Sequence, residues 1–274
     1  MKEGGGIIGK VKDGIVDAIH GVGDITGAVV DVVSGTLEKT LKGTRTVGGE
    51  LTSLIKDTVI GTVQGVSEIG SEIGSAAKGI VIGTMRGTKE IGQNTLETLS
   101  GSVRALIHSV SEVGGDVAHT AKEAVQGGIV AAKEMGVGAA EAASEAATSV
   151  IKSVREVGGE LNSATRSALT GVLHGAKEVG VTAAESIRST AGAVVRATSE
   201  TGGDIAEVAK NAVEGAIQGA KDVGLDAADA ASEAATGAIE AASKIGSGAA
   251  EKVRNAVTGT ISGVKVILKE PFKK

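Results

Sequence analysis

The residues best suited to chemistry are four histidines, which could bind a metal ion or exchange a proton near neutral pH. When the chain is divided into 11-residue units, His20, His108, His119 and His174 all fall at the same position of the unit. On one helix, His108 and His119 would lie about 16.5 Å apart, whereas ligands sit about 2 Å from a metal ion that they share. A metal or pH-sensing site would therefore need several helices to come together. Otherwise the histidines are solvated or interhelical polar residues.

Two other patterns resemble parts of catalytic or nucleotide sites. Carboxylates and lysines recur along the chain, but paired carboxylates serve acid–base catalysis only where a pocket shifts their pKa values. The string Gly136-Val137-Gly138 does not follow a strand, which is the context that a phosphate-binding loop requires. The chain has no cysteine to bind metal as a thiolate. We therefore predict no enzyme, no cofactor and no small-molecule substrate, and we assign the charges to a solvated face that also fixes partner register.

The composition limits the classes of protein to which the chain can belong. It has 274 residues, a net charge of -5, 43 glycines, one proline and one aromatic residue, Phe272. A compact core of this size would normally use many aromatic rings, and scarce proline favours unbroken helix. The acidic balance and the missing rings argue against nucleic-acid binding. No signal peptide follows Lys2, and no apolar run approaches the roughly 20 residues of a membrane span, so an intracellular location is the default expectation.

An 11-residue repeat, used in two alternating versions, organises the chain. In one version the central position is a glycine, which therefore returns at every second unit. We predict that these glycines are helix-packing notches: Gly48, Gly70, Gly92, Gly114, Gly136, Gly158, Gly180, Gly202, Gly224 and Gly246. In the other version the same position is alanine or a larger apolar residue. We predict that the larger ones are packing knobs: Val59, Val81, Val103, Val125, Leu169, Val213 and Val257.

The period predicts an all-α protein. Eleven residues make three turns at about 3.67 residues per turn, which places the apolar positions within an arc of roughly 130°. The phase holds through residues 11–268, which we predict to be one helical repeat array between a leader, 1–10, and a tail, 269–274. Very long glycine-rich helices, packed side by side as a bundle or filament, would reach about 375 Å. The alternative is a set of 44-residue helical hairpins that bend at double glycines such as Gly114-Gly115.

The glycines also bear on the partners of such a helix. Each glycine costs about 1 kcal/mol relative to alanine inside a helix, so an isolated helix needs external stabilisation. A second helix could supply it, because glycine lets two backbones approach closely. A copy shifted by one repeat unit would set its knobs against the notches. We therefore predict a non-enzymatic structural protein that binds itself, through self-association or folding back.

The segment Thr120–Glu134, with its repeated lysine, glutamate, glycine, valine and alanine, resembles the 11-residue amphipathic repeat families. These are the synucleins, the perilipins and the group 3 late-embryogenesis proteins, and the similarity of period and composition covers nearly the whole chain. The resemblance implies a chain that becomes helical on a membrane, a lipid droplet or a drying surface. A lipid-coating protein is therefore the alternative function, and a desiccation or stress protectant is the third.

Overall fold

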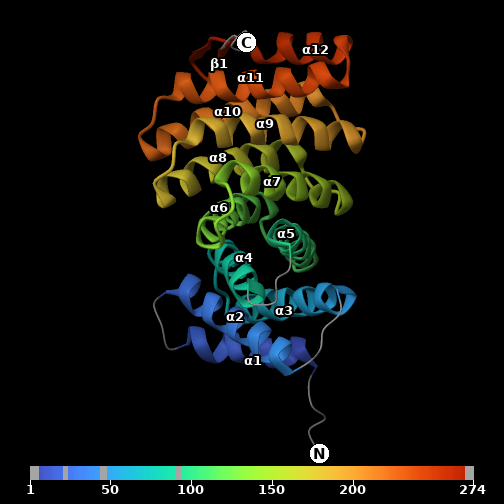
Figure 1. Cartoon of the computed structure of the whole chain (residues 1–274), viewed down its shortest axis with the longest axis vertical. Coiled ribbons are helices and arrows are strands. Elements are labelled where there is room, and N and C mark those ends of the chain that lie inside the picture. The colour runs from blue at the N-terminus through green and yellow to red at the C-terminus, as the bar shows by residue number, and fades with distance from the viewer. Residues whose placement is uncertain (1–5, 21–23, 44–47, 90–93, 269–274) are drawn as a thin grey trace, which may run out of the picture.

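The computed structural model describes all residues except 1–5, 21–23, 44–47, 90–93 and 269–274. The described part confirms the all-α prediction, with twelve helices packed side by side (Figure 1). The helices are α1 (Ile7–Ile19), α2 (Ile25–Gly43), α3 (Gly48–Glu68), α4 (Ile73–Thr88), α5 (Thr95–Glu112), α6 (Val117–Met135), α7 (Ala139–Glu156), α8 (Leu161–Val179), α9 (Ala183–Glu200), α10 (Ile205–Val223), α11 (Ala227–Ile245) and α12 (Ser247–Val257).

The helices form two layers that run the length of the molecule. Even-numbered helices pack on one another, from α2 through α4, α6, α8 and α10, and odd-numbered helices do the same from α1 to α11. Sequence neighbours also touch, so the layers enclose a core between them. Figure 1 shows the resulting stack, with the N-terminal helices at one end and α11 and α12 at the other. This is a helical-repeat solenoid, in which each hairpin contacts its neighbours along the stack.

The prediction of very long continuous helices was wrong, and the 44-residue hairpins were the correct alternative. Within the described ranges the longest helix, α3, has 21 residues. From α6 to α10, 19-residue and 18-residue helices alternate, separated by turns of three and four residues. A helix and the turn that follows it therefore always span two repeat units, so the 11-residue phase survives every turn. The unbroken phase reflects repeats of equal length, not an unbroken helix.

Most of the glycines that return at every second unit lie where a helix ends. Most of those described have left-handed backbones, with φ between 68° and 76°: Gly70, Gly114, Gly136, Gly158, Gly180, Gly202 and Gly224. Gly136 N–H donates to Lys133 O, and the next N–H, of Val137, donates to Ala132 O. This pair of bonds is the Schellman ending of a helix, which favours glycine because a side chain strains the left-handed conformation.

For the seven left-handed glycines and Gly246, the prediction of packing notches was therefore wrong. A Cβ atom built on any of those seven glycines, or on Gly246, would meet no atom within 4 Å. Gly48 is the first residue of α3, and Gly92 lies outside the described residues. A glycine needed for its backbone conformation and one needed for closeness look alike in a sequence, because both tolerate no side chain.

The ends of the array also differ from the prediction. Helix α1 begins at Ile7, within the proposed leader 1–10, and the helices end at Val257 instead of 268. Strands β1 (Gly259–Ile261) and β2 (Val264–Val266) follow as an antiparallel pair, with Ile261 opposite Val264. Ser262 and Gly263 between them both have positive φ, as the tightest hairpin turns require. The tail 269–274 lies outside the described residues.

Candidate functional site

A second set of glycines, inside the helices, brings the even-numbered helices into backbone contact. These glycines occur once in each successive even helix: Gly83, Gly127, Gly171 and Gly215. A Cβ atom on Gly127 would lie 2.9 Å from the carbonyl oxygen of Lys78 on α4. A Cβ atom on Gly171 would overlap the carbonyl oxygen of Lys122 on α6. We call these four residues, together with Gly61 and Gly237 of the odd layer, the contact glycines.

At the equivalent repeat position, the odd-numbered helices carry glycine only near the two ends of their layer, in α3 and α11. A Cβ atom on Gly61 would lie 2.6 Å from Ile8 O, and one on Gly237 would overlap Arg188 O. The corresponding positions of the intervening helices hold Ala105, Ser149 and Ala193. Backbones therefore approach closely wherever the contact glycines occur.

The predicted knobs are all fully buried, and all but Val257, the last residue of α12, lie near the middle of their helices: Val59, Val81, Val103, Val125, Leu169, Val213 and Val257. They belong to the core between the layers. They do not face the glycines predicted as notches, which lie at the helix ends. The signal that sequence reasoning missed is glycine repeated four residues apart within one helix, as in Gly61 and Gly65, Gly171 and Gly175, or Gly215 and Gly219. Small residues at this spacing form one ridge of a helix and favour close helix packing.

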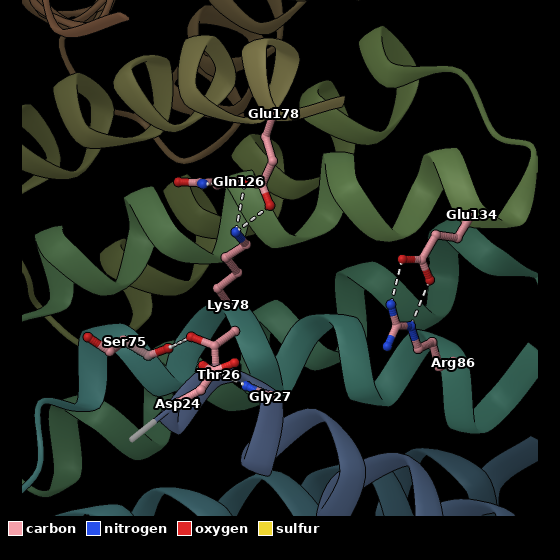
Figure 2. Close-up of polar contacts among 9 residues, drawn as sticks. All are labelled: Asp24, Thr26, Gly27, Ser75, Lys78, Arg86, Gln126, Glu134 and Glu178. Carbon is pink, nitrogen blue, oxygen red and sulfur yellow. Dashed lines mark hydrogen bonds and ion pairs between the residues drawn. The ribbon is translucent and has the colours of Figure 1, made fainter. Parts of the chain in front are cut away.

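Ion pairs connect several of the helices to the next one in their layer. Arg86 on α4 donates two hydrogen bonds to Glu134 on α6, at 2.7 and 2.6 Å (Figure 2). Two further pairs have the same sequence separation: Lys152 with Glu200, at 2.8 Å, and Arg166 with Glu214, at 3.3 Å. Like the contact glycines, these bonds connect residues in successive repeats and help to fix the register of the stack.

One ion pair skips a helix. The position on α6 that would pair with Glu178 holds Val130, which cannot donate a hydrogen bond. Glu178 instead accepts hydrogen bonds from Lys78 of α4, at 2.6 and 2.7 Å, and from Gln126 of α6, at 2.6 Å. Figure 2 shows Lys78 reaching toward Glu178 beside Gln126. Side chains of helices α4 and α8 therefore meet over α6.

The histidines do not assemble into a metal site in the part of the chain that the structure describes. His108 and Glu156 lie 2.8 Å apart across α5 and α7, and His174 and Asp222 lie 3.6 Å apart across α8 and α10. His119 covers Gly74 of α4, where any side chain would overlap the imidazole ring. Three of the four histidines are thus interhelical residues, which is one of the two interpretations that the sequence left open.

The ion pairs predict a loss of stability in acid. The hydrogen bond from Arg86 lowers the pKa of Glu134, and that from Lys152 lowers the pKa of Glu200. Burial alone would raise the pKa of Glu178, but the hydrogen bonds from Lys78 and Gln126 lower it overall. A lowered folded-state pKa stabilises the protein above the unfolded value of about 4.3, and this contribution disappears as pH falls through the folded values.

We expect the free energy of unfolding to fall as the pH drops below about 5, because the carboxylates must then protonate. Glu178→Gln should reduce this pH dependence and cost about 0.5–1 kcal/mol at neutral pH, since solvent screens a half-exposed pair. Urea unfolding at several pH values measures both effects. An unchanged pH slope in the variant would contradict a stabilising role for the Lys78–Glu178 pair.

No family model matches the chain, and no curated protein is significantly similar to it. The resemblance to the synuclein, perilipin and late-embryogenesis families therefore remains one of period and composition. None of the helices in the described ranges is both long and apolar enough to cross a membrane. The function must be argued from the geometry of the stack.

Proposed function

We propose that this chain is a non-enzymatic structural protein, a scaffold whose helical bundle is formed within one molecule. The observation that carries the proposal is the packing of each helix on the next one in its layer, with backbone contact wherever a contact glycine occurs. Through these contacts the chain buries its own apolar stripes, as the fully buried Ile107, Ile151 and Leu173 illustrate. The sequence indicated that a glycine-rich helix needs a stabilising partner, and other helices of the same chain supply it.

The outer face of the first hairpin, α1 and α2, carries charged residues at contact positions, which favours a stack of finite length. Asp17 of α1 and Lys39 of α2 occupy the positions that hold Gly61 in α3 and Gly83 in α4, one repeat later. Both side chains are exposed. Helical-repeat proteins need polar outer faces on their terminal repeats to remain soluble. A charged side chain at a contact position also prevents another helix from approaching as closely as α3 approaches α1.

Circular dichroism over a dilution series, with light scattering for mass, tests this proposal. We expect high helix content in plain buffer, unchanged on dilution, with a mass near the 26.8 kDa of one chain. Helix content that falls on dilution would instead favour the bundle or filament of several chains predicted from the sequence. A coil that becomes helical only with anionic vesicles would overturn the scaffold and favour the lipid-coating alternative.

A further inference from the structure

A hollow opens on the odd layer between α9 and α11. Its cavity volume is about 210 Å³, and two helix-internal glycines, Gly192 and Gly237, lie at its base. A Cβ atom on Gly192 would lie 3.1 Å from Gly237 O, so the two helices are close here. Sites for drug-sized ligands have volumes of roughly 300–1,000 Å³. This hollow suits a smaller molecule or ion.

Three cations surround the hollow: Arg188 and Arg196 of α9, and Lys244 of α11. Two carboxylates, Glu185 and Glu240, also line it. Arg188 Nη2 lies 3.2 Å from Glu240 Oε1, which offsets part of its charge. Its Nε atom is buried and donates no hydrogen bond, because the nearest carboxylate oxygen, on Glu233, is 3.9 Å away. Among the described residues, no ion pair or hydrogen bond engages Arg196 or Lys244.

The repeat explains why Arg196, whose charge acts on Glu200 of its own helix, has no carboxylate partner on the next odd helix. Its equivalents in the two preceding odd helices are His108 and Lys152, which pair with Glu156 and Glu200 of the next odd helix. The equivalent position in α11 is occupied by Lys244, so the charge is reversed at this one point. The Arg196 guanidinium lies over Gly192 instead, 3.3 Å from where a Cβ atom would stand.

A second departure from the repeat occurs at Arg188. The equivalent positions in α5 and α7 hold Ser100 and Ser144, and each of these serines hydrogen-bonds to a serine of the next odd helix. In α9 the serine is replaced by a large cation whose Nε proton is unused. The chain thus changes two positions, 188 and 244, to lysine or arginine around one hollow, and a third cation there loses its usual partner.

We propose that this hollow binds a small oxyanion of the phosphate class, either free or as the terminal group of a phosphomonoester. The Arg196 guanidinium and the Lys244 ammonium would donate charge-assisted hydrogen bonds to the anion, and the positive charge of Arg188, which also lines the hollow, would add to the attraction. Guanidinium groups suit phosphate because their donors match its oxygens in a planar, forked arrangement. The hollow includes one contact glycine, Gly237, but the proposed anion contacts are made by side chains that take no part in the scaffold proposal.

Calorimetric titration of the whole chain tests the site, with inorganic phosphate in one arm and glycerol phosphate in the other. Ionic strength is held constant with chloride, so that general screening does not change. We expect saturable binding of one anion per chain. Equal affinity in both arms would identify a terminal phosphate as the ligand, whereas binding of inorganic phosphate alone would identify the free ion. No binding in either arm would overturn the proposal.

Lys244→Glu is the sharpest variant, because it restores the acid found at this position of the earlier repeats. We expect it to fold, to pair with Arg196, and to weaken anion binding by about tenfold or more through loss of a charge-assisted hydrogen bond. Lys56→Glu is the matched control. It makes the same charge change at the repeat position of Arg188, in α3, and should leave the affinity unchanged. Equal affinity in Lys244→Glu and the native chain, or equal losses in both variants, would contradict a defined site.

Discussion

Gly171→Ala is expected to destabilise the protein by about 1–3 kcal/mol, although alanine normally strengthens a helix. The added methyl group would overlap the carbonyl oxygen of Lys122, which is part of the α6 backbone and cannot rotate away. Helices α6 and α8 would have to separate, and the side chains packed beside the joint would lose contact. Urea unfolding monitored by circular dichroism measures the loss.

Gly101→Ala is the matched control for this prediction. Gly101 also lies inside a helix, α5, but a Cβ atom there would meet nothing within 4 Å. We expect the substitution to stabilise the protein by about 0.5–1 kcal/mol, through the helix propensity of alanine alone. Opposite signs for the two variants would establish that closeness, not propensity, determines the glycine at position 171. Stabilisation by both would show that the helices do not meet as described.

The second large effect concerns the glycines at the helix ends. Replacing Gly136, Gly158, Gly180 and Gly202 together with alanine should cost about 4–8 kcal/mol, because each left-handed residue with a side chain costs about 1–2 kcal/mol. Domains of ordinary stability unfold at about 5–15 kcal/mol, so this variant should be close to unfolding at room temperature. Thermal unfolding of the single and combined variants measures how the cost accumulates.

Asparagine at the same four positions separates the two roles that such glycines can have. Asparagine has a larger side chain than alanine but adopts the left-handed conformation more readily. If these glycines serve the turns, the asparagine variant should be the more stable of the two. If they were notches, the larger asparagine would be the more damaging. The second result would restore the packing role that the sequence predicted for Gly158 and its equivalents.

The helical class and the composition of the core could be predicted from the sequence. The apolar positions of the 11-residue unit correctly placed residues such as Val103 and Leu169 in the interior, because burial follows helical periodicity. The 11-residue phase alone could not distinguish hairpins from one continuous helix. A helix and turn that together span two repeat units keep the phase that a continuous helix would have. The doubled glycines, such as Gly114-Gly115, were the local signal for the turns.

The contact glycines and the hollow could be recognised only from the three-dimensional structure. Gly171 becomes recognisable only when Lys122, on the preceding even helix, is placed against it. The same holds for Arg196 and Lys244, which are also far apart in sequence. The two like charges at positions 196 and 244 become unusual only by comparison with Lys152 and Glu200, which form an ion pair at the equivalent positions one repeat earlier. The hairpin β1–β2 was missed because strands of three residues are too short to show an alternating pattern.

Small-angle X-ray scattering of the chain in dilute buffer tests the central claim most directly. A stack folded within one molecule predicts monomers whose radius of gyration somewhat exceeds the value for a compact chain of this length, which is about 19 Å. A continuous helix would extend to about 375 Å and would give a radius of gyration of about 100 Å, with the scattering of a thin rod. The first result supports hairpins that bury their own apolar stripes. Rod-like scattering would contradict the glycine turns, the two layers and the scaffold together.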